Sequence, residues 1–163
     1  MEAHERFAAV TSHWEAVVEE MHDVAERYRA DGYRTVEIHP GDVAVVGPDE
    51  EGRTGFDVVA PDDEFDRLES LTETYGFTSY EVFRGDADAM VFPLVALEAA
   101  SDDVAVFVPL YYERSELGTL RDVVENRDVL RSTVRPLAGD RSVTFAHSDP
   151  APFFPGEDAP ATA

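Results

Sequence analysis

Over the first thirty residues, apolar side chains recur at alternating spacings of three and four positions, and acidic residues fill the opposite side. This period places the apolar residues on one stripe of an α-helix. Asp31-Gly32 follows and supplies a stop, because glycine readily adopts the left-handed conformation that closes a helix. The pattern therefore predicts one long amphipathic helix whose stripe contains Phe7, Val10, Trp14, Val17, Met21, Val24 and Tyr28.

The same spacing is also a seven-residue repeat held over three heptads, so two interpretations stay open. A heptad seam can pair two helices in a coiled coil, whereas a single amphipathic helix more commonly lies across a sheet. In the first case the stripe would be a helix interface for self-association. The candidate interface residues are Trp14, Val17, Met21 and Val24.

Further apolar runs predict strands and two shorter helices. Alternating residues in 35–38 and 43–46, with Pro40-Gly41 between them, predict a hairpin. A strand over 56–59 and a helix from 61 to 76 follow. The second half repeats this order loosely, with strands at 77–84, 89–98 and 104–112 and a helix over 115–126.

The two long strands of the second half are apolar on nearly every residue, so both of their faces should be covered. Antiparallel pairing about Ser101 would set Pro93 opposite Pro109. Because proline cannot donate to the ladder, a gap or bulge is expected at that level, or a position that faces away from the hydrogen bonds.

The last hairpin is predicted to turn at Gly139-Asp140. A two-residue loop there would pair Val134 with Phe145 on the inner face. The opposite face would then carry Arg131, Thr133 and Arg135.

These elements together predict an α+β fold with a mainly antiparallel β-sheet, a long N-terminal amphipathic helix and two shorter helices. At 163 residues the chain is near the usual size of one domain. Residues 1–150 are expected to form a single α+β domain. The Pro/Ala-rich stretch 151–163 is expected to be a flexible C-terminal tail, in which Phe153 and Phe154 are the residues able to dock.

The charge of the chain indicates the salt environment in which this fold is stable. There are 35 acidic residues against 13 basic ones, all of them arginine, for a formal net charge of −22. In dilute buffer this charge would strain a compact chain, whereas at about 1 M salt the Debye length falls to about 3 Å and most of the repulsion is screened. Arginine, with its weakly hydrated fork, suits carboxylate pairing under such conditions. The composition therefore predicts a protein of a halophilic cytoplasm; the alternative is an acidic mesophilic protein, which would normally keep some lysine.

Composition also excludes several kinds of chemistry. The chain has no cysteine, which removes disulfides, thiolate metal sites and thiol nucleophiles. The N-terminus lacks the layout of a signal peptide, and no apolar run approaches the roughly 18 residues that span a bilayer. No membrane partner is expected, and the acidity argues against general nucleic-acid binding. Phosphate-loop, dinucleotide-binding and serine-elbow motifs are missing, so no cofactor is expected.

Six of the 13 arginines lie between Arg114 and Arg141, where five acids accompany them. Arg131 and Arg135 share a predicted strand face, and Arg127 lies close to them in sequence. Such a group can hold a phosphate, a carboxylate or an acidic partner, while surface ion pairs are the plainer interpretation. Arg127, Arg131 and Arg135 are the candidate anion- or partner-binding residues.

The histidines offer one candidate metal site. His39 lies beside Asp42 at the first predicted turn, and His147 lies beside Asp149 at the end of the last predicted strand. Histidine and aspartate bind transition metals, and these four residues would meet if the two strand ends were neighbours. No fixed metal-binding spacing is present, so two surface histidines near acids are the alternative.

Three functional hypotheses result. The first is a non-enzymatic interaction or regulatory protein, which associates with itself or with a protein partner through the helix stripe or the apolar strands. The alternative is a small-ligand-binding or metal-dependent enzyme that uses His39, His147 and the arginine cluster. The third is phosphate or nucleic-acid contact through the three candidate arginines.

Four short stretches resemble an uncharacterised family of small acidic haloarchaeal proteins of unknown function. The likeness extends from about Trp14 to Phe154 and supports the halophilic interpretation. It implies no activity and no site residues. The stretches are His39-Pro40-Gly41-Asp42-Val43, Pro61-Asp62-Asp63-Glu64-Phe65, Val108-Pro109-Leu110-Tyr111-Tyr112 and Val143-Thr144-Phe145-Ala146-His147.

Overall fold

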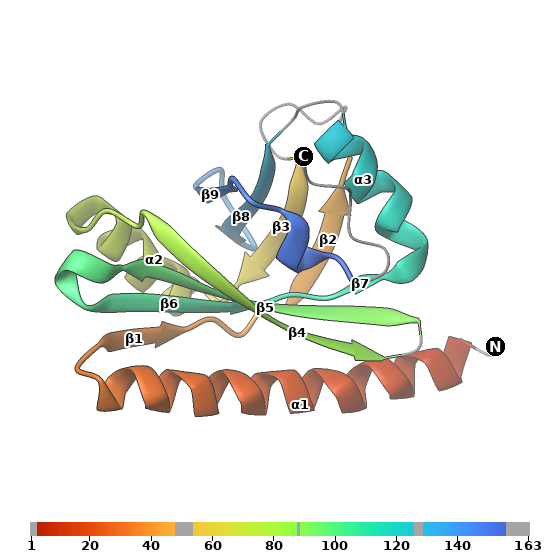
Figure 1. Cartoon of the computed structure of the whole chain (residues 1–163), viewed down its shortest axis with the longest axis horizontal. Coiled ribbons are helices and arrows are strands. Elements are labelled where there is room, and N and C mark those ends of the chain that lie inside the picture. Colours follow the sequence, from red (N-terminus) through yellow and green to blue (C-terminus); the bar gives the residue numbers. More distant parts are fainter. Residues whose placement is uncertain (1–2, 48–53, 88, 126–128, 156–163) are drawn as a thin grey trace.

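The computed structural model describes residues 3–47, 54–87, 89–125 and 129–155. Within them the chain forms three α-helices and two mixed sheets, which confirms the predicted α+β class (Figure 1). The helices are α1 (Ala3–Ala30), α2 (Asp62–Thr74) and α3 (Leu117–Glu125). The strands are β1 (Arg34–Glu37), β2 (Asp42–Val46), β3 (Gly55–Ala60), β4 (Ser79–Ala87), β5 (Met90–Ala99), β6 (Val104–Pro109), β7 (Tyr112–Glu113), β8 (Leu130–Pro136) and β9 (Val143–His147).

The first sheet, sheet A, has the strand order β1-β6-β5-β4, and the short β7 also pairs with β5. Strand β5 runs antiparallel to β4 and β6, whereas β1 runs parallel to β6. Every residue of β6 and all but one residue of β5 are buried. The continuous apolar runs correctly predicted that both faces of these strands are covered.

The second sheet, sheet B, has the order β2-β3-β8-β9. Its two central strands, β3 and β8, run parallel, and each edge strand pairs antiparallel with its neighbour. Along the edge strand β9, exposed residues alternate with less exposed ones up to the buried His147. Such alternation is typical of a sheet with one buried and one open face.

Helix α1 lies along one face of sheet A (Figure 1), so its stripe from Trp14 onward packs on a sheet within the chain. Its Tyr28 hydroxyl donates to Glu98 of β5. Of the candidate interface residues, Val17, Met21 and Val24 are buried, and Trp14 packs edge-on against Tyr111. Apolar contacts of this layer come from Met21, Val24 and Ala25 of the helix and Leu94, Ala96, Ala105 and Phe107 of the sheet.

The main core lies between the other face of sheet A and the inner face of sheet B. Helices α2 and α3 close it, with Phe65 and Leu120 fully buried in it. Beyond position 150 the chain stays packed: Phe153 and Phe154 are also fully buried, and the Tyr112 hydroxyl donates to the Phe153 carbonyl oxygen at 2.6 Å. The packed chain thus extends past the predicted boundary, to Pro155; residues 156–163 lie outside the described residues.

The predicted hairpin over 35–46 is wrong. Strand β1 pairs with β6 in sheet A, and β2 pairs with β3 in sheet B, so Pro40-Gly41 connects the two sheets. Val36, Ile38 and Val43 all point into the shared core. Alternation correctly identified the buried face of each strand, but it carries no information about the pairing partner.

The two predicted registers are also wrong, each for a reason of loop length. Pro109 pairs with Leu94 instead of Pro93, because a four-residue connection ends at Asp103 in the left-handed conformation with φ 55°. Val134 pairs with Val143, two residues from the predicted partner, because the connection between β8 and β9 spans residues 137–142. This second shift, of two residues, keeps every side chain of β8 and β9 on its predicted face.

Candidate interaction surface on the second sheet

Sheet B differs from sheet A in having an open outer face. Its inner side chains join the main core with sheet A, α2 and α3. On the outer face, Ala44 of β2 and Thr144 and Ala146 of β9 are exposed. The exposed side chains of this face therefore lie on its two edge strands, while Thr133 and Asp57 of the central strands are 2% and 8% exposed.

Strand β8 and the residues next to it contribute arginine, threonine and apolar side chains to this face. Positions 129, 131, 133, 135 and 137 alternate along the extended chain, and the register places the three central residues on the outer face. Val129 and Leu137, immediately before and after β8, are 38% and 79% exposed. They are the large hydrophobic side chains left exposed in the described part of the chain. We call Val129, Arg131, Thr133, Arg135 and Leu137 the β8 face.

Arg135 is fixed by an ion pair with Asp57 on the neighbouring strand β3. Its Nε donates to both carboxylate oxygens, at 3.0 and 3.2 Å, and its Nη2 donates to Oδ2 at 3.1 Å. The Asp57 side chain is 9% exposed, and forked pairing is the geometry that offsets the desolvation of a carboxylate. The hydrogen bond to Asp57 raises the pKa of Arg135 above its usual value.

Arg131 is held differently, with no carboxylate within ion-pair distance among the described residues. Its Nη1 donates to the Thr54 hydroxyl at 3.0 Å and to the Val129 carbonyl at 3.3 Å. Gly55 supports this position, because a Cβ there would lie 2.2 Å from the Arg131 carbonyl oxygen, and its φ is +130°. Only glycine allows β3 to approach Arg131 this closely.

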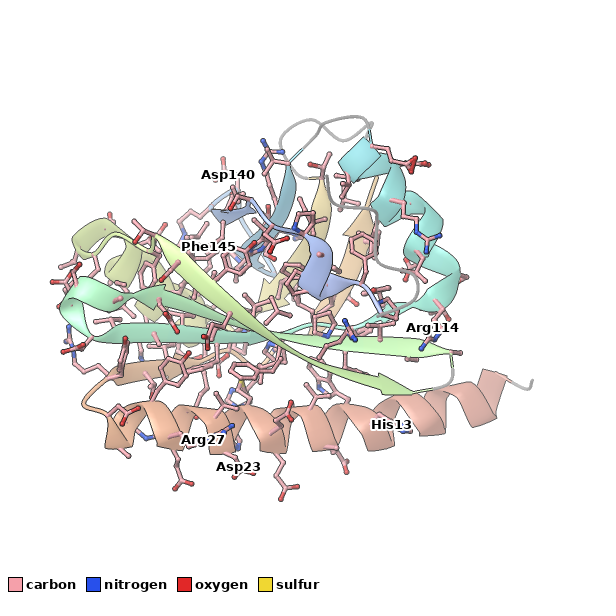
Figure 2. The ribbon with its side chains drawn as sticks, viewed as in Figure 1. His13, Asp23, Arg27, Arg114, Asp140 and Phe145 are labelled. Atoms are coloured by element: carbon pink, nitrogen blue, oxygen red, sulfur yellow. The ribbon has the colours of Figure 1, made fainter. Side chains whose placement is uncertain are left out.

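A polar hollow of about 520 Å³ adjoins the β8 face. It is lined by Thr133 and Arg135 and by the connection between β8 and β9, from which Asp140 projects in Figure 2. Arg141 anchors this connection to α2 through Asp66 at 3.2 Å and Glu69 at 2.8 Å. The hollow can therefore receive a side chain with hydrogen-bonding groups beside the open face.

The candidate metal residues are not brought together. His147 ends β9, whereas Asp42 begins β2, and β2 and β9 are the opposite edges of sheet B. The pairings Asp42↔Val59 and Leu130↔His147 also place them at opposite ends of the strands. In the part of the chain that the structure describes, no group of three or more His, Asp or Glu side chains is placed to hold a metal ion.

His147 is instead a core residue, 2% exposed. Its Nε2 lies 2.8 Å from the Ser132 hydroxyl oxygen, and the Tyr80 and Phe153 rings pack against it with centroids 4.8 Å away. Nδ1 has no hydrogen-bond partner among the described residues. Burial lowers the pKa of His147 from 6.5 to about 4, so the ring is neutral at pH 7.

The other candidates are equally dispersed. His39 follows β1 and contacts His22 of α1 and Glu64 of α2. The backbone N–H of Asp149 donates to the Tyr80 hydroxyl oxygen at 2.9 Å. Arg127 lies outside the described residues.

The sequence analysis did not identify three residues of the outer face of sheet B: Asp57, Val129 and Leu137. The alternation that linked Arg131 with Arg135 extends by one step to each of the two apolar residues, so this signal was present in the sequence. The partnership with Asp57 was not, because it depends on β3 lying beside β8.

Among the described residues, no helix combines the length and apolarity needed to cross a bilayer.

Comparison with known proteins gives a family but no activity. No curated protein and no solved structure matches the chain. The model of a family of unknown function, DUF7529, matches residues 2–155. The chain therefore belongs to the family of unknown function DUF7529.

Proposed function

We propose that this protein is a non-enzymatic interaction protein that binds an acidic segment of a partner protein on the outer face of sheet B. The observation that carries this proposal is the β8 face, where two exposed apolar side chains bracket two arginines on an otherwise acidic chain. Arginine flanked by apolar contact area is the composition enriched at protein interfaces.

The partner follows from charge complementarity. Arg131 has guanidinium N–H groups that can pair with a carboxylate, whereas Asp57 already balances the charge of Arg135 beside it. Val129 and Leu137 can bury apolar side chains at the two ends of the same segment. The small outer side chains of β2 and β9 allow an extended chain to approach closely.

The enzyme hypothesis receives no comparable support. It requires His39, His147 and the arginines around one pocket, and these residues contact separate parts of the structure. From Trp14 onward, the stripe of α1 packs against the apolar strands of sheet A, so these two surfaces, the ones first considered for a partner, face each other. The outer face of sheet B is the open surface that can serve an interaction protein.

A direct test uses a labelled peptide that alternates glutamate and leucine, measured by fluorescence anisotropy in molar KCl. Arg131→Gln and Leu137→Ser should each weaken binding about tenfold, equivalent to about 1.4 kcal/mol. Arg67→Gln, which removes an exposed arginine of α2, is the matched control and should bind like the wild type.

Two results would contradict the proposal. One is equal binding of a peptide in which glutamine replaces every glutamate. The other is displacement of the acidic peptide by inorganic phosphate, which would make the arginines a phosphate or nucleic-acid site.

The environment is part of the proposal: a halophilic cytoplasm in which dissolved ions screen the net charge of −22. Urea unfolding at stepwise lower KCl should show the midpoint falling steeply. An unchanged cooperative transition with almost no electrolyte would refute this assignment.

A further inference from the structure

Three elements bring a second group of polar side chains together. His22 comes from α1, His39 from the segment after β1, and Glu64 from the first turn of α2. The two imidazole Nε2 atoms lie 3.1 Å apart, with ring centroids at 5.3 Å. Both histidines are exposed.

Glu64 fixes the orientation of His39. Its Oε1 accepts from the His39 backbone N–H at 2.6 Å, and its Oε2 accepts from Nδ1 at 2.8 Å. A carboxylate on Nδ1 selects the tautomer that carries its proton there. His39 Nε2 therefore presents a lone pair to His22, whose Nε2–H donates to it.

We propose that this pair is a binding site for a divalent late-transition-metal ion, which replaces the hydrogen bond between the two Nε2 atoms while the His22 proton moves from Nε2 to Nδ1 of the same ring. A carboxylate–histidine–metal arrangement is the usual support for such a ligand, because the carboxylate fixes the ring and raises its basicity. Imidazole suits nickel and zinc, whereas the many surface carboxylates suit magnesium and calcium.

The distance between the ligand atoms fits this ion class. With metal–nitrogen bonds of about 2.1 Å, two nitrogens 3.1 Å apart subtend an angle of about 95° at the metal. This angle lies between the cis angle of an octahedron and the tetrahedral angle. In the hydrogen-bonded pair the two Nε2 atoms point at each other, so each of the exposed rings turns by about 40° to direct its lone pair at the ion.

The site has two protein ligands, and water fills the other coordination positions, since no third His, Asp or Glu among the described residues completes it. Binding joins α1 directly to the segment that connects sheets A and B. A ligand that binds the folded chain alone raises its stability in proportion to the logarithm of its concentration. The bound ion therefore links α1 to the segment between the two sheets and stabilises the folded chain.

The test is thermal unfolding and equilibrium dialysis of the full chain with NiCl₂ in molar KCl at neutral pH. Wild type should bind one Ni²⁺ per chain, and its Tm should rise with Ni²⁺ concentration. His22→Ala and His39→Ala should each abolish the rise. Glu64→Gln should weaken the affinity about tenfold or more.

The matched control is His13→Ala, which removes another exposed histidine of α1 and should keep the full response. Magnesium should give no difference between wild type and the two histidine variants. The proposal fails if His22→Ala and His39→Ala bind Ni²⁺ as wild type does, or if one ion is shared by two chains.

Discussion

Sheets A and B are built from similar apolar strands, yet they meet different surroundings. Sheet A lies between α1 and the main core, and its strands β5 and β6 have almost no exposed residues. Sheet B contributes one face to the same core and leaves the other open. The ion pair of sheet B joins two neighbouring central strands, Asp57 of β3 and Arg135 of β8, whereas the polar contacts of sheet A, such as Arg29 with Glu37 and Tyr28 with Glu98, tie its strands to α1. The difference separates a face that stabilises the fold from a face that can bind.

The largest effect should come from breaking the covered side of sheet A. Met21 is fully buried between α1 and β5 and β6, so Met21→Ala should destabilise the protein by about 2–5 kcal/mol through lost contacts and a cavity. Urea unfolding of the variant and the wild type measures this loss of unfolding free energy. Asp23→Ala, on the solvent side of the same helix (Figure 2), should stay within about 0.5 kcal/mol of wild type; equal losses would mean that α1 is not packed as described.

The second effect concerns the inner face of sheet B and depends on pH. The unfolded chain takes up a proton on His147 near pH 6.5, but the folded chain takes it up only near pH 4. The unfolded state therefore binds more protons in this window, and stability falls as the pH drops from about 6.5 to 4, by up to about 3 kcal/mol.

His147→Gln should remove this part of the pH dependence, because glutamine can keep the hydrogen bond to Ser132 without titrating. The difference in unfolding free energy between variant and wild type, followed from pH 8 to pH 4, reports His147 alone (carboxylates titrate equally in both). A difference that is constant with pH would show that His147 is not buried as a neutral ring.

A smaller loss is expected on the open face. Arg135→Ala leaves the largely buried Asp57 without its forked partner, and should destabilise the protein by about 1–2 kcal/mol, given the partial exposure of the pair. Arg135→Lys keeps the positive charge but loses the forked hydrogen bonds, so its unfolding free energy should lie between those of Arg135→Ala and the wild type. If alanine and wild type unfold at the same urea concentration, the ion pair contributes no stability.

The smallest effect is expected at the exposed end of the β8 face. Leu137 is 79% exposed, so Leu137→Ser should change the unfolding free energy by less than about 0.5 kcal/mol. The same variant should weaken peptide binding, which separates binding from folding. A large loss of stability would instead place Leu137 in the fold and remove it from the proposed interface.

The sequence by itself determined the elements and their faces. The period of the first thirty residues specified helix α1, and strand alternation placed Arg131, Thr133 and Arg135 on one side even with a wrong register. These features are local, because a helical or extended chain turns its side chains at a fixed period whatever its neighbours are. The net charge, likewise, is a sum that needs no structure.

Only the tertiary structure decided which elements meet. It assigned β1 and β2 to different sheets, laid α1 on sheet A, paired Asp57 with Arg135 and joined His22 to His39. Each of these depends on contacts between residues far apart in the chain, where loop lengths and shared burial choose among partners of equal hydrophobicity. For the same reason His147 became a neutral core residue: its position in sheet B, and not its neighbours in sequence, removed it from water.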